Sequence, residues 1–259
     1  KLSSTIYNMK ERDENTFARF FNQGDYITLK NQLFNYRFRK YMLARAYTKY
    51  TSKNVKNILL DLGCGISPVS PCPNQTTFID SDKNAIGLLK KLGHKTLKGN
   101  VNNIPFGKST VDAIFCSEVL EHVHNYKIAI KEFFRVLRKD GLLFITVPTH
   151  IKYWSFDDDY VGHLRRFNPK KLAREIGAEG FDILENKPIG SLLERELTKF
   201  LVRKAIKSSQ KPMNFGKVKL KLFNVVNKFL FGIIYVTHLL NNSKNSSIVL
   251  IVARKKSIS

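Results

Sequence analysis

The chain has 259 residues, of which 43% are hydrophobic, enough to bury one substantial core and an appended piece. Its 44 lysines and arginines outnumber the 21 acidic residues and give a net charge of +23, which suits RNA, anionic lipid headgroups, acidic substrates or a plain lysine-rich surface. Three widely separated cysteines argue against a disulfide framework and a zinc site, and the first residues lack the apolar core of a secretory signal, so we expect a cytoplasmic protein.

The positive charge is concentrated in the two flanks of the sequence. Residues 1–50 carry 10 Lys or Arg against 4 Asp or Glu, and residues 191–247 carry 11 against 2. The stretch 101–190 is nearly neutral, with 13 basic and 12 acidic residues. Over 15–51, apolar residues recur every three to four positions with Arg and Lys between them, which predicts a basic helical extension.

Strand and helix patterns alternate from residue 56 onward. Strands are predicted at 57–63, 76–82, 94–101, 111–117 and 141–148, of which the first and last are nearly all apolar. Helices are predicted at 84–93, which ends at a glycine, and at 121–141, where a basic last turn precedes a glycine stop. Strands that are buried on both faces and separated by helices predict a doubly wound, mostly parallel α/β sheet.

Two more strands are predicted after this run, with a long interruption between them. Asn168 is a helix cap with Pro169 at the first position, and a strand follows that helix; the last strand lies in 246–256. Between the two strands, 190–207 and 217–240 read as helices. Phe229–Leu240, the longest apolar run, has 12 residues, short of the ~18 that a membrane span needs.

These patterns divide the chain into four parts. We predict a basic helical extension at 1–55, a Rossmann-like core at 56–190, a basic and apolar helical insertion at 191–246, and the last core strand with a tail at 247–259. The core sheet is expected to have seven strands with helices on both faces.

Gly63 and Gly65 follow the first predicted strand, at the carboxyl edge where an open parallel sheet binds its ligand. Glycine lets the backbone approach a ligand closely and turn with positive φ. The pyrophosphate-binding pattern needs a third glycine, but Pro68 stands in its place, so dinucleotide binding is disfavoured. A ligand with a ribose and no phosphate remains, and Asp80 at the end of the second strand suits the two ribose hydroxyl groups.

Six stretches resemble, in order and spacing, the class I S-adenosylmethionine-dependent methyltransferases, in particular the broad group with quinone-biosynthesis and other small-molecule enzymes. They are DLGCG, FIDSD, GNVNNIPF, VDAIFCSEVLEHV, FRVLRKDGLLFITVP and GHLRRFNPKKL. The resemblance covers about residues 57–188 and the final strand. It implies S-adenosylmethionine as cofactor, S-adenosylhomocysteine as product, in-line transfer of a methyl group, and no requirement for a metal.

The resemblance also assigns cofactor-binding roles along the sheet edge. The residues are Asp61, Gly63, Cys64 and Gly65 for the methionine end, Asp80 and Ser81 for the ribose, Asn100 and Val101 for the adenine, and Cys116 and Ser117 beside the methyl group. The family usually has Asp where this chain has Asn100, but the Asn carbonyl can still accept a hydrogen bond from the adenine amino group.

Three side chains near the expected acceptor are candidate catalytic residues. His163 lies in the loop after the fifth strand, and His122 and Glu118 follow the fourth strand. Each has a plainer explanation: His163 as a surface histidine, and the other two as residues suited to a helix N-terminus. A general base is needed only where the acceptor is a hydroxyl or an acidic carbon.

The loop after the fifth strand carries further candidates. Tyr153, Trp154 and Arg165 are candidate substrate-binding residues, with simple packing as the alternative. The acidic run 157–159 looks like a metal site, but we expect a solvated loop there.

The flanks suggest which acceptor is used. The segment 217–240 has a basic start and an apolar continuation, as in a helix that lies in an anionic membrane surface, covers the active site or makes a dimer contact. We therefore expect a methyltransferase for a small or lipid-like acceptor, cytoplasmic or peripheral to a membrane. The alternatives are an RNA methyltransferase that uses the basic flanks, with Tyr36, Arg37, Phe38, Arg39 and Tyr41 contacting the nucleic acid, and an inactive cofactor-binding partner subunit. The sequence leaves the oligomeric state open.

Overall fold

The computed structural model describes residues 30–51, 58–208, 217–240 and 246–256. The predicted helix over 15–51 is described from residue 30 onward, and its earlier part lies outside the described residues, as does most of the polar linker between the two late helices.

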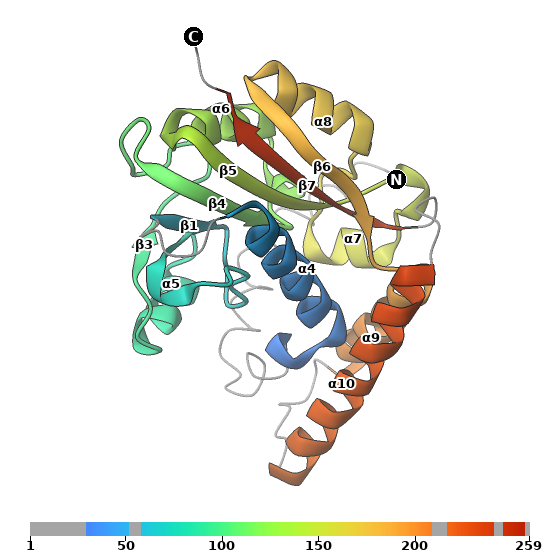
Figure 1. The fold of residues 1–259 in the computed structure, drawn as a ribbon. Helices are drawn as coiled ribbons and strands as arrows, with labels where there is room; N and C mark the ends of the chain where they lie inside the picture. Colours follow the sequence, from blue (N-terminus) through green and yellow to red (C-terminus); the bar gives the residue numbers. More distant parts are fainter. Residues whose placement is uncertain (1–29, 52–57, 209–216, 241–245, 257–259) are drawn as a thin grey trace, which may run out of the picture.

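Seven strands form one mixed sheet in the order β3-β2-β1-β4-β5-β7-β6, with β7 antiparallel to both of its neighbours (Figure 1). The strands are β1 Leu59–Leu62, β2 Thr76–Asp80, β3 Thr96–Lys98, β4 Val111–Ser117, β5 Leu137–Pro148, β6 Phe181–Ile189 and β7 Ile248–Lys255. The predicted doubly wound, mostly parallel sheet is confirmed. Strand order reverses between β1 and β4, so the carboxyl ends of these two strands flank the position where such sheets bind ligands.

One face of the sheet is covered by α6 (Tyr126–Val136) and α8 (Pro169–Ala178). The buried positions of α6 are 129, 130, 133 and 136, the three-to-four spacing of one helix face. α8 starts as predicted, because the Asn168 side chain accepts a hydrogen bond from the Lys171 N–H at 3.1 Å and Pro169 occupies the first turn. α5 (Lys83–Lys91) lies beside β2 and β3.

The opposite face is covered by α4 (Phe34–Tyr50), against which α10 (Lys217–Leu240) packs, with α9 (Leu192–Ser208) beside it (Figure 1). The Tyr47 ring lies 5.7 Å from Phe115 and 5.9 Å from Phe144, which project from neighbouring strands. The basic flanks of the sequence therefore contribute one layer of the fold.

The predicted helix over 121–141 is shorter in the structure. A 3-10 turn, η2 (Leu120–His122), precedes α6, and α6 ends at Val136. Leu137 already pairs with Val111 of β4, and the chain then turns with Asp140 at a φ of 61°. A Cβ on Gly141 would lie 2.9 Å from the Arg138 carbonyl oxygen, so this glycine permits a tight turn within β5 rather than a helix stop.

Helix α10 packs on α4 through a buried polar contact and aromatic rings. Asn227 Oδ1 accepts a hydrogen bond from the Phe34 N–H at 3.0 Å, and Tyr41 packs edge-on against Phe231 and Tyr235 at 5.8 and 5.6 Å. The other side of α10 is exposed and apolar. Its exposed apolar residues are Leu222, Val225, Val226, Phe229, Val236, Leu239 and Leu240, and Lys219, Lys221 and Lys228 are exposed as well.

Helix α10 also corrects the prediction that no segment is long enough to cross a membrane. Lys219–Leu240 meets that criterion by length and composition, because apolar residues of the preceding turns extend the 12-residue run despite Lys228 in the middle and Lys219 and Lys221 near its start. Only 11% of the apolar 18-residue stretch of this helix is buried in the fold.

Replacing Asn227 by Ala tests how α10 is attached. The change leaves the buried Phe34 N–H without a partner, so the free energy of unfolding should fall by about 1–3 kcal/mol, measured by urea denaturation. Lys228→Ala, an exposed change one residue away, should shift it by less than about 0.5 kcal/mol. Equal midpoints for the two variants would contradict the contact.

Candidate functional site

The loop after β1 has the backbone shape predicted for a ligand-binding loop. Gly63 and Gly65 have φ values of 65° and 50°. A Cβ on Gly63 would lie 2.5 Å from Val119, so only glycine fits there, whereas Gly65 has nothing within 4 Å of the Cβ position. The backbone at Gly65 is therefore open to a ligand.

Asp80 joins this loop to the end of β2. Its Oδ2 accepts a hydrogen bond from the Gly65 N–H at 2.7 Å, and its Oδ1 accepts one from the Asp82 N–H at 2.9 Å. The carboxylate is half-buried, and this burial raises its pKa despite the backbone donors. Each oxygen keeps a lone pair for a hydroxyl donor. The open glycine and this carboxylate fit a cofactor with a ribose.

Asp61 accepts hydrogen bonds from the backbone of the loop that follows β1. Its Oδ2 accepts hydrogen bonds from the N–H groups of Val69 and Ser70, at 2.7 and 2.9 Å. Burial raises its pKa to about 7, against the opposing effect of those two donors. Asp61 therefore holds the glycine loop against β1, and any contact with the methionine end of a cofactor would be additional.

Two predicted cofactor contacts, Cys64 and Cys116, have buried side chains in the structure. Cys116 is fully buried in the core that α6 and α8 cover, and Cys64 packs with Phe78 and Leu89. Burial raises the pKa of both thiols, so neither is a nucleophile. Only their backbone can face the ligand edge.

The remaining predicted cofactor residues lie at the same edge. Ser117 Oγ is 2.7 Å from Thr146 Oγ1 at the carboxyl ends of β4 and β5. Ser81 follows Asp80 and is exposed. Asn100 is exposed, with Oδ1 accepting a hydrogen bond from the Asn102 N–H at 2.9 Å, and Val101 is buried beside it. One lone pair of the Asn100 carbonyl is thus used within the chain.

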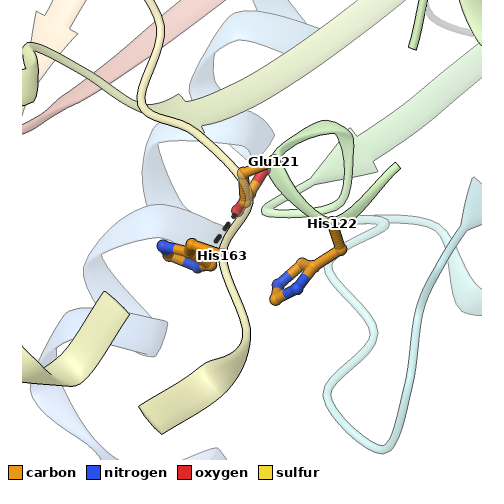
Figure 2. A group of neighbouring side chains, drawn as sticks. All are labelled: Glu121, His122 and His163. Carbon is orange, nitrogen blue, oxygen red and sulfur yellow. Dashed lines mark ion pairs between the residues drawn. The ribbon is translucent and has the colours of Figure 1, made fainter. Parts of the chain in front are cut away.

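Two of the predicted catalytic residues, His122 and His163, meet beyond the end of β4, next to Glu121 (Figure 2). The imidazole centroids are 4.8 Å apart, and His163 Nε2 lies 3.8 Å from Glu121 Oε1. His122 reaches the surface, and desolvation by the surrounding chain, with repulsion from His163, lowers its pKa to about 4. Glu121 is fully buried.

A buried carboxylate orients His163. Asp158 Oδ1 lies 2.7 Å from His163 Nδ1 and 2.8 Å from Arg166 Nε, and its Oδ2 accepts from Arg166 Nη2 at 3.0 Å. Although burial opposes it, these donors lower the pKa of Asp158. The predicted solvated acidic loop is wrong: residues 157–159 form the first turn of α7 (Phe156–Val161), capped by Ser155, with Asp158 inside.

Helices α4 and α9 bring further charge close to this cluster of side chains. Glu118, with a φ of 57°, pairs with Arg39 of α4 at 3.2 Å. Glu194 of α9 is buried, and burial raises its pKa to about 7, with Arg39 opposing and Glu118 adding to the effect. We call Glu118, Glu121, His122, His163 and Glu194 the acceptor mouth.

The three predicted substrate-binding residues have partners within the chain. Arg165 donates to the carbonyls of Val123 and His124, at 2.8 and 3.1 Å. Tyr153 is buried beneath the Arg195 guanidinium, which lies 4.9 Å from the ring centroid. Trp154 Nε1 donates to Asp159 at 3.0 Å. Packing thus accounts for these side chains without a substrate.

Asp158, Arg166, Arg39 and Glu194 lie at this candidate site but were not predicted there. The sequence suggested an RNA contact for Arg39 and a solvated loop for Asp158, and no role for the other two. Arg166 lies in the stretch GHLRRFNPKKL, close in sequence to His163 and to the acidic run 157–159. This closeness could have suggested an ion pair between the arginine and one of the acids. Arg39 and Glu194 come from the flanks, and no local pattern connects them with β4.

Comparison with known proteins agrees with the resemblance. Residues 60–145 match the family model described as a methyltransferase domain. The chain is 24% identical over 155 residues to a probable S-adenosylmethionine-dependent methyltransferase of Mycobacterium tuberculosis, with 57% of this chain and 56% of that protein covered. It is 34% identical over 140 residues to an uncharacterized protein of Methanocaldococcus jannaschii, with 51% and 58% covered. The chain thus spans less than two thirds of the length of these relatives.

The fold is also similar to solved structures. A possible histamine N-methyltransferase from Thermotoga maritima superposes with a TM-score of 0.56 at 17% identity, with 96% of this chain and 100% of that chain covered. The expected resemblance to class I S-adenosylmethionine-dependent methyltransferases and the expected fold are therefore confirmed.

Asp158→Ala tests the buried network. The change leaves Arg166 and His163 without their shared partner, so we expect a loss of about 3–5 kcal/mol in the free energy of unfolding, measured by denaturant titration. Asp159→Ala, an exposed change on the same helix turn, should cost less than about 1 kcal/mol. Similar losses for both variants would mean that Asp158 only caps α7.

Proposed function

Because the chain carries a methyltransferase domain on the class I fold, we propose that it is an S-adenosylmethionine-dependent methyltransferase acting on a small or lipid-like acceptor. The observation that carries the proposal is the contact between the open glycine loop and Asp80, with the Gly65 N–H 2.7 Å from Asp80 Oδ2. It combines a backbone open to a ligand with a carboxylate suited to ribose hydroxyls.

The residues have distinct tasks in this proposal. Gly63, Gly65 and Asp80 would hold the cofactor, which supplies an electrophilic methyl group when bound. The acceptor mouth lies beyond the neighbouring strand β4, and there His122, His163 and Glu118 would contact the acceptor. Helices α4 and α9 approach this opening through Arg39 and Glu194. They would exclude water and restrict the acceptor to a productive orientation, which lowers the barrier of a bimolecular transfer.

The exposed face of α10 supports a lipid-like acceptor at an anionic membrane surface. Phe229 is 70% exposed and Leu222 63% exposed, on the same helix as Lys217, Lys219 and Lys221. An apolar helix face with lysines at one end suits the boundary between acyl chains and anionic headgroups. Burying such side chains is worth about 1.5–3 kcal/mol each.

The packing of α10 favours a helix that lies on the membrane over one that crosses it. Its inner side is joined to α4 by the buried Asn227 contact and by aromatic rings. Crossing would require either breaking that packing or carrying α4 into the bilayer, with Arg37 and Arg39 on it. The outer face alone can enter the interface with α4 still in place.

The same packing weakens the RNA alternative. Tyr36 and Phe38 are buried, and Tyr41 packs against α10, so these rings are not available to stack on bases. The basic residues of α4 would then have to bind nucleic acid through phosphates alone.

Asp80→Ala should remove cofactor binding. Two hydrogen bonds from hydroxyls to a charged acceptor are worth about 1.5–3 kcal/mol each, so affinity for S-adenosylhomocysteine should fall at least about 100-fold by isothermal titration calorimetry. Asp182→Asn, an exposed carboxylate on β6 that pairs with Lys256, serves as the control and should bind normally. Normal binding by the Asp80 variant would refute the site.

The protein should sediment with anionic vesicles. When the vesicles contain a cellular lipid extract, it should also transfer labelled methyl groups from S-adenosylmethionine into an organic-soluble product. Changing Leu222 and Phe229 together to Ser should weaken sedimentation at least about tenfold, because two apolar contacts are lost. Leu92→Ser, which alters a side chain 61% exposed after α5, should leave it unchanged. Asp80→Ala should sediment normally and transfer no label.

Other outcomes would point to the alternatives. Label in added RNA, with binding that falls steeply as salt rises, would support the RNA methyltransferase. Cofactor binding without label in lipid, small-molecule or RNA fractions of a cell extract would support an inactive partner subunit.

A further inference from the structure

We propose that Glu121, His122 and His163 form a binding site for one divalent transition-metal ion of the zinc type at the acceptor mouth. The role assigned to the ion rests on the proposed function, but the site itself rests on the geometry of these three side chains. No metal site was predicted from the sequence, because its three cysteines are widely separated and the resembling family does not require a metal.

The donor atoms of the three residues converge. One ligand atom from each lies within 4.8 Å of those of the other two, and Figure 2 shows His163 reaching toward Glu121 from the facing loop. In a tetrahedral zinc site the donors lie about 2.0–2.2 Å from the ion, which places them about 3.3–3.6 Å from one another. Small side-chain rotations would therefore close the site.

Both imidazoles have Nδ1 at hydrogen-bonding distance from an acceptor within the chain, and neither Nε2 makes a hydrogen bond among the described residues. His163 Nδ1 lies 2.7 Å from the Asp158 carboxylate, and His122 Nδ1 lies 3.3 Å from the Gly162 carbonyl oxygen. Both partners accept hydrogen bonds only, so the proton of each neutral ring is on Nδ1 and the Nε2 lone pair is available. A carboxylate or carbonyl behind the distal nitrogen is the usual support of a metal-binding histidine.

Glu121 is an independent sign of a ligand. It is fully buried, and neither of its carboxylate oxygens has a hydrogen-bond partner among the described residues. Its nearest basic group is His163 Nε2, at 3.8 Å. Burying a carboxylate without partners is expensive, and a cation between Glu121 and the two histidines would offset that cost.

The donor set selects the type of ion. Two imidazoles and one carboxylate suit Zn²⁺ and its first-row neighbours, whereas Mg²⁺ and Ca²⁺ prefer oxygen donors. Three protein ligands also leave a coordination position open. In the proposed methyltransferase, an acceptor oxygen would take this position, where the cation would orient it and lower the pKa of a hydroxyl.

Isothermal titration of the EDTA-treated full chain with ZnCl₂ and with MgCl₂ tests the site. We expect one equivalent of Zn²⁺ to bind, more tightly than Mg²⁺. His122→Ala, a change at the surface, and Glu121→Gln, a change of equal shape, should each weaken Zn²⁺ binding at least about 100-fold, since even outer-shell partners of a metal are worth about 10–100-fold. The exposed His124→Ala variant should bind as the wild type does.

The outcomes separate this proposal from the proposed function. Absence of Zn²⁺ binding to the wild type, or equal binding by the Glu121, His122 and His124 variants, would overturn the metal site. S-adenosylhomocysteine affinity is measured on the same samples and depends on Asp80, not on these ligands. Zn²⁺ binding without cofactor binding would keep the metal site and refute the methyltransferase, whereas cofactor binding without Zn²⁺ would do the reverse.

Discussion

The sheet must be buried on both faces, and the rest of the structure depends on that constraint. Phe115 and Phe144 stack on one face with ring centroids 5.0 Å apart, and α4 covers them with Tyr47. The same helix places Arg39 3.2 Å from Glu118, beyond the end of β4. A helix needed to exclude water from the sheet therefore also supplies charge to the residues called the acceptor mouth, so α4 is packed into the core and contacts the candidate site.

The strands were predictable because a strand that is buried on both faces appears in the sequence as a nearly continuous apolar run. The run predicted at 111–117 is β4, residue for residue, and the last strand was found although 55 or so residues without sheet pattern precede it. The helix predicted at 121–141 was too long, because its apolar spacing continues through Leu137, which instead pairs with Val111. Periodicity detects an apolar face, but tertiary pairing decides where a helix ends.

The site was predictable where the backbone itself carries the chemistry. Two glycines and an acid at strand ends are visible in the sequence, since no other residue types give that turn and that acceptor. The sequence does not show which polar side chains are buried. Asp158 is one of three consecutive acidic residues, yet it alone is buried and contacts Arg166 and His163. For Cys116 the sequence located the end of a strand but not the face of the sheet that the side chain takes, and the side chain lies in the core.

The charge inside the ligand edge is opposite to that of the whole chain. The protein carries +23, yet Asp61, Asp80, Glu121 and Glu194 are half-buried or buried at or near this edge, and burial raises the pKa of each. Among the described residues, Arg39 and Arg166 are close enough to Glu121 to oppose that shift. Retaining desolvated acids costs stability unless cations compensate them. A cofactor with a sulfonium group at this edge and a metal ion beside Glu121 would each bring positive charge where the fold has concentrated carboxylates. The exterior charge would then have a separate role, which is attraction to an anionic surface. This attraction acts over about 10 Å in dilute salt. It leaves the short-range interactions of the interior unchanged.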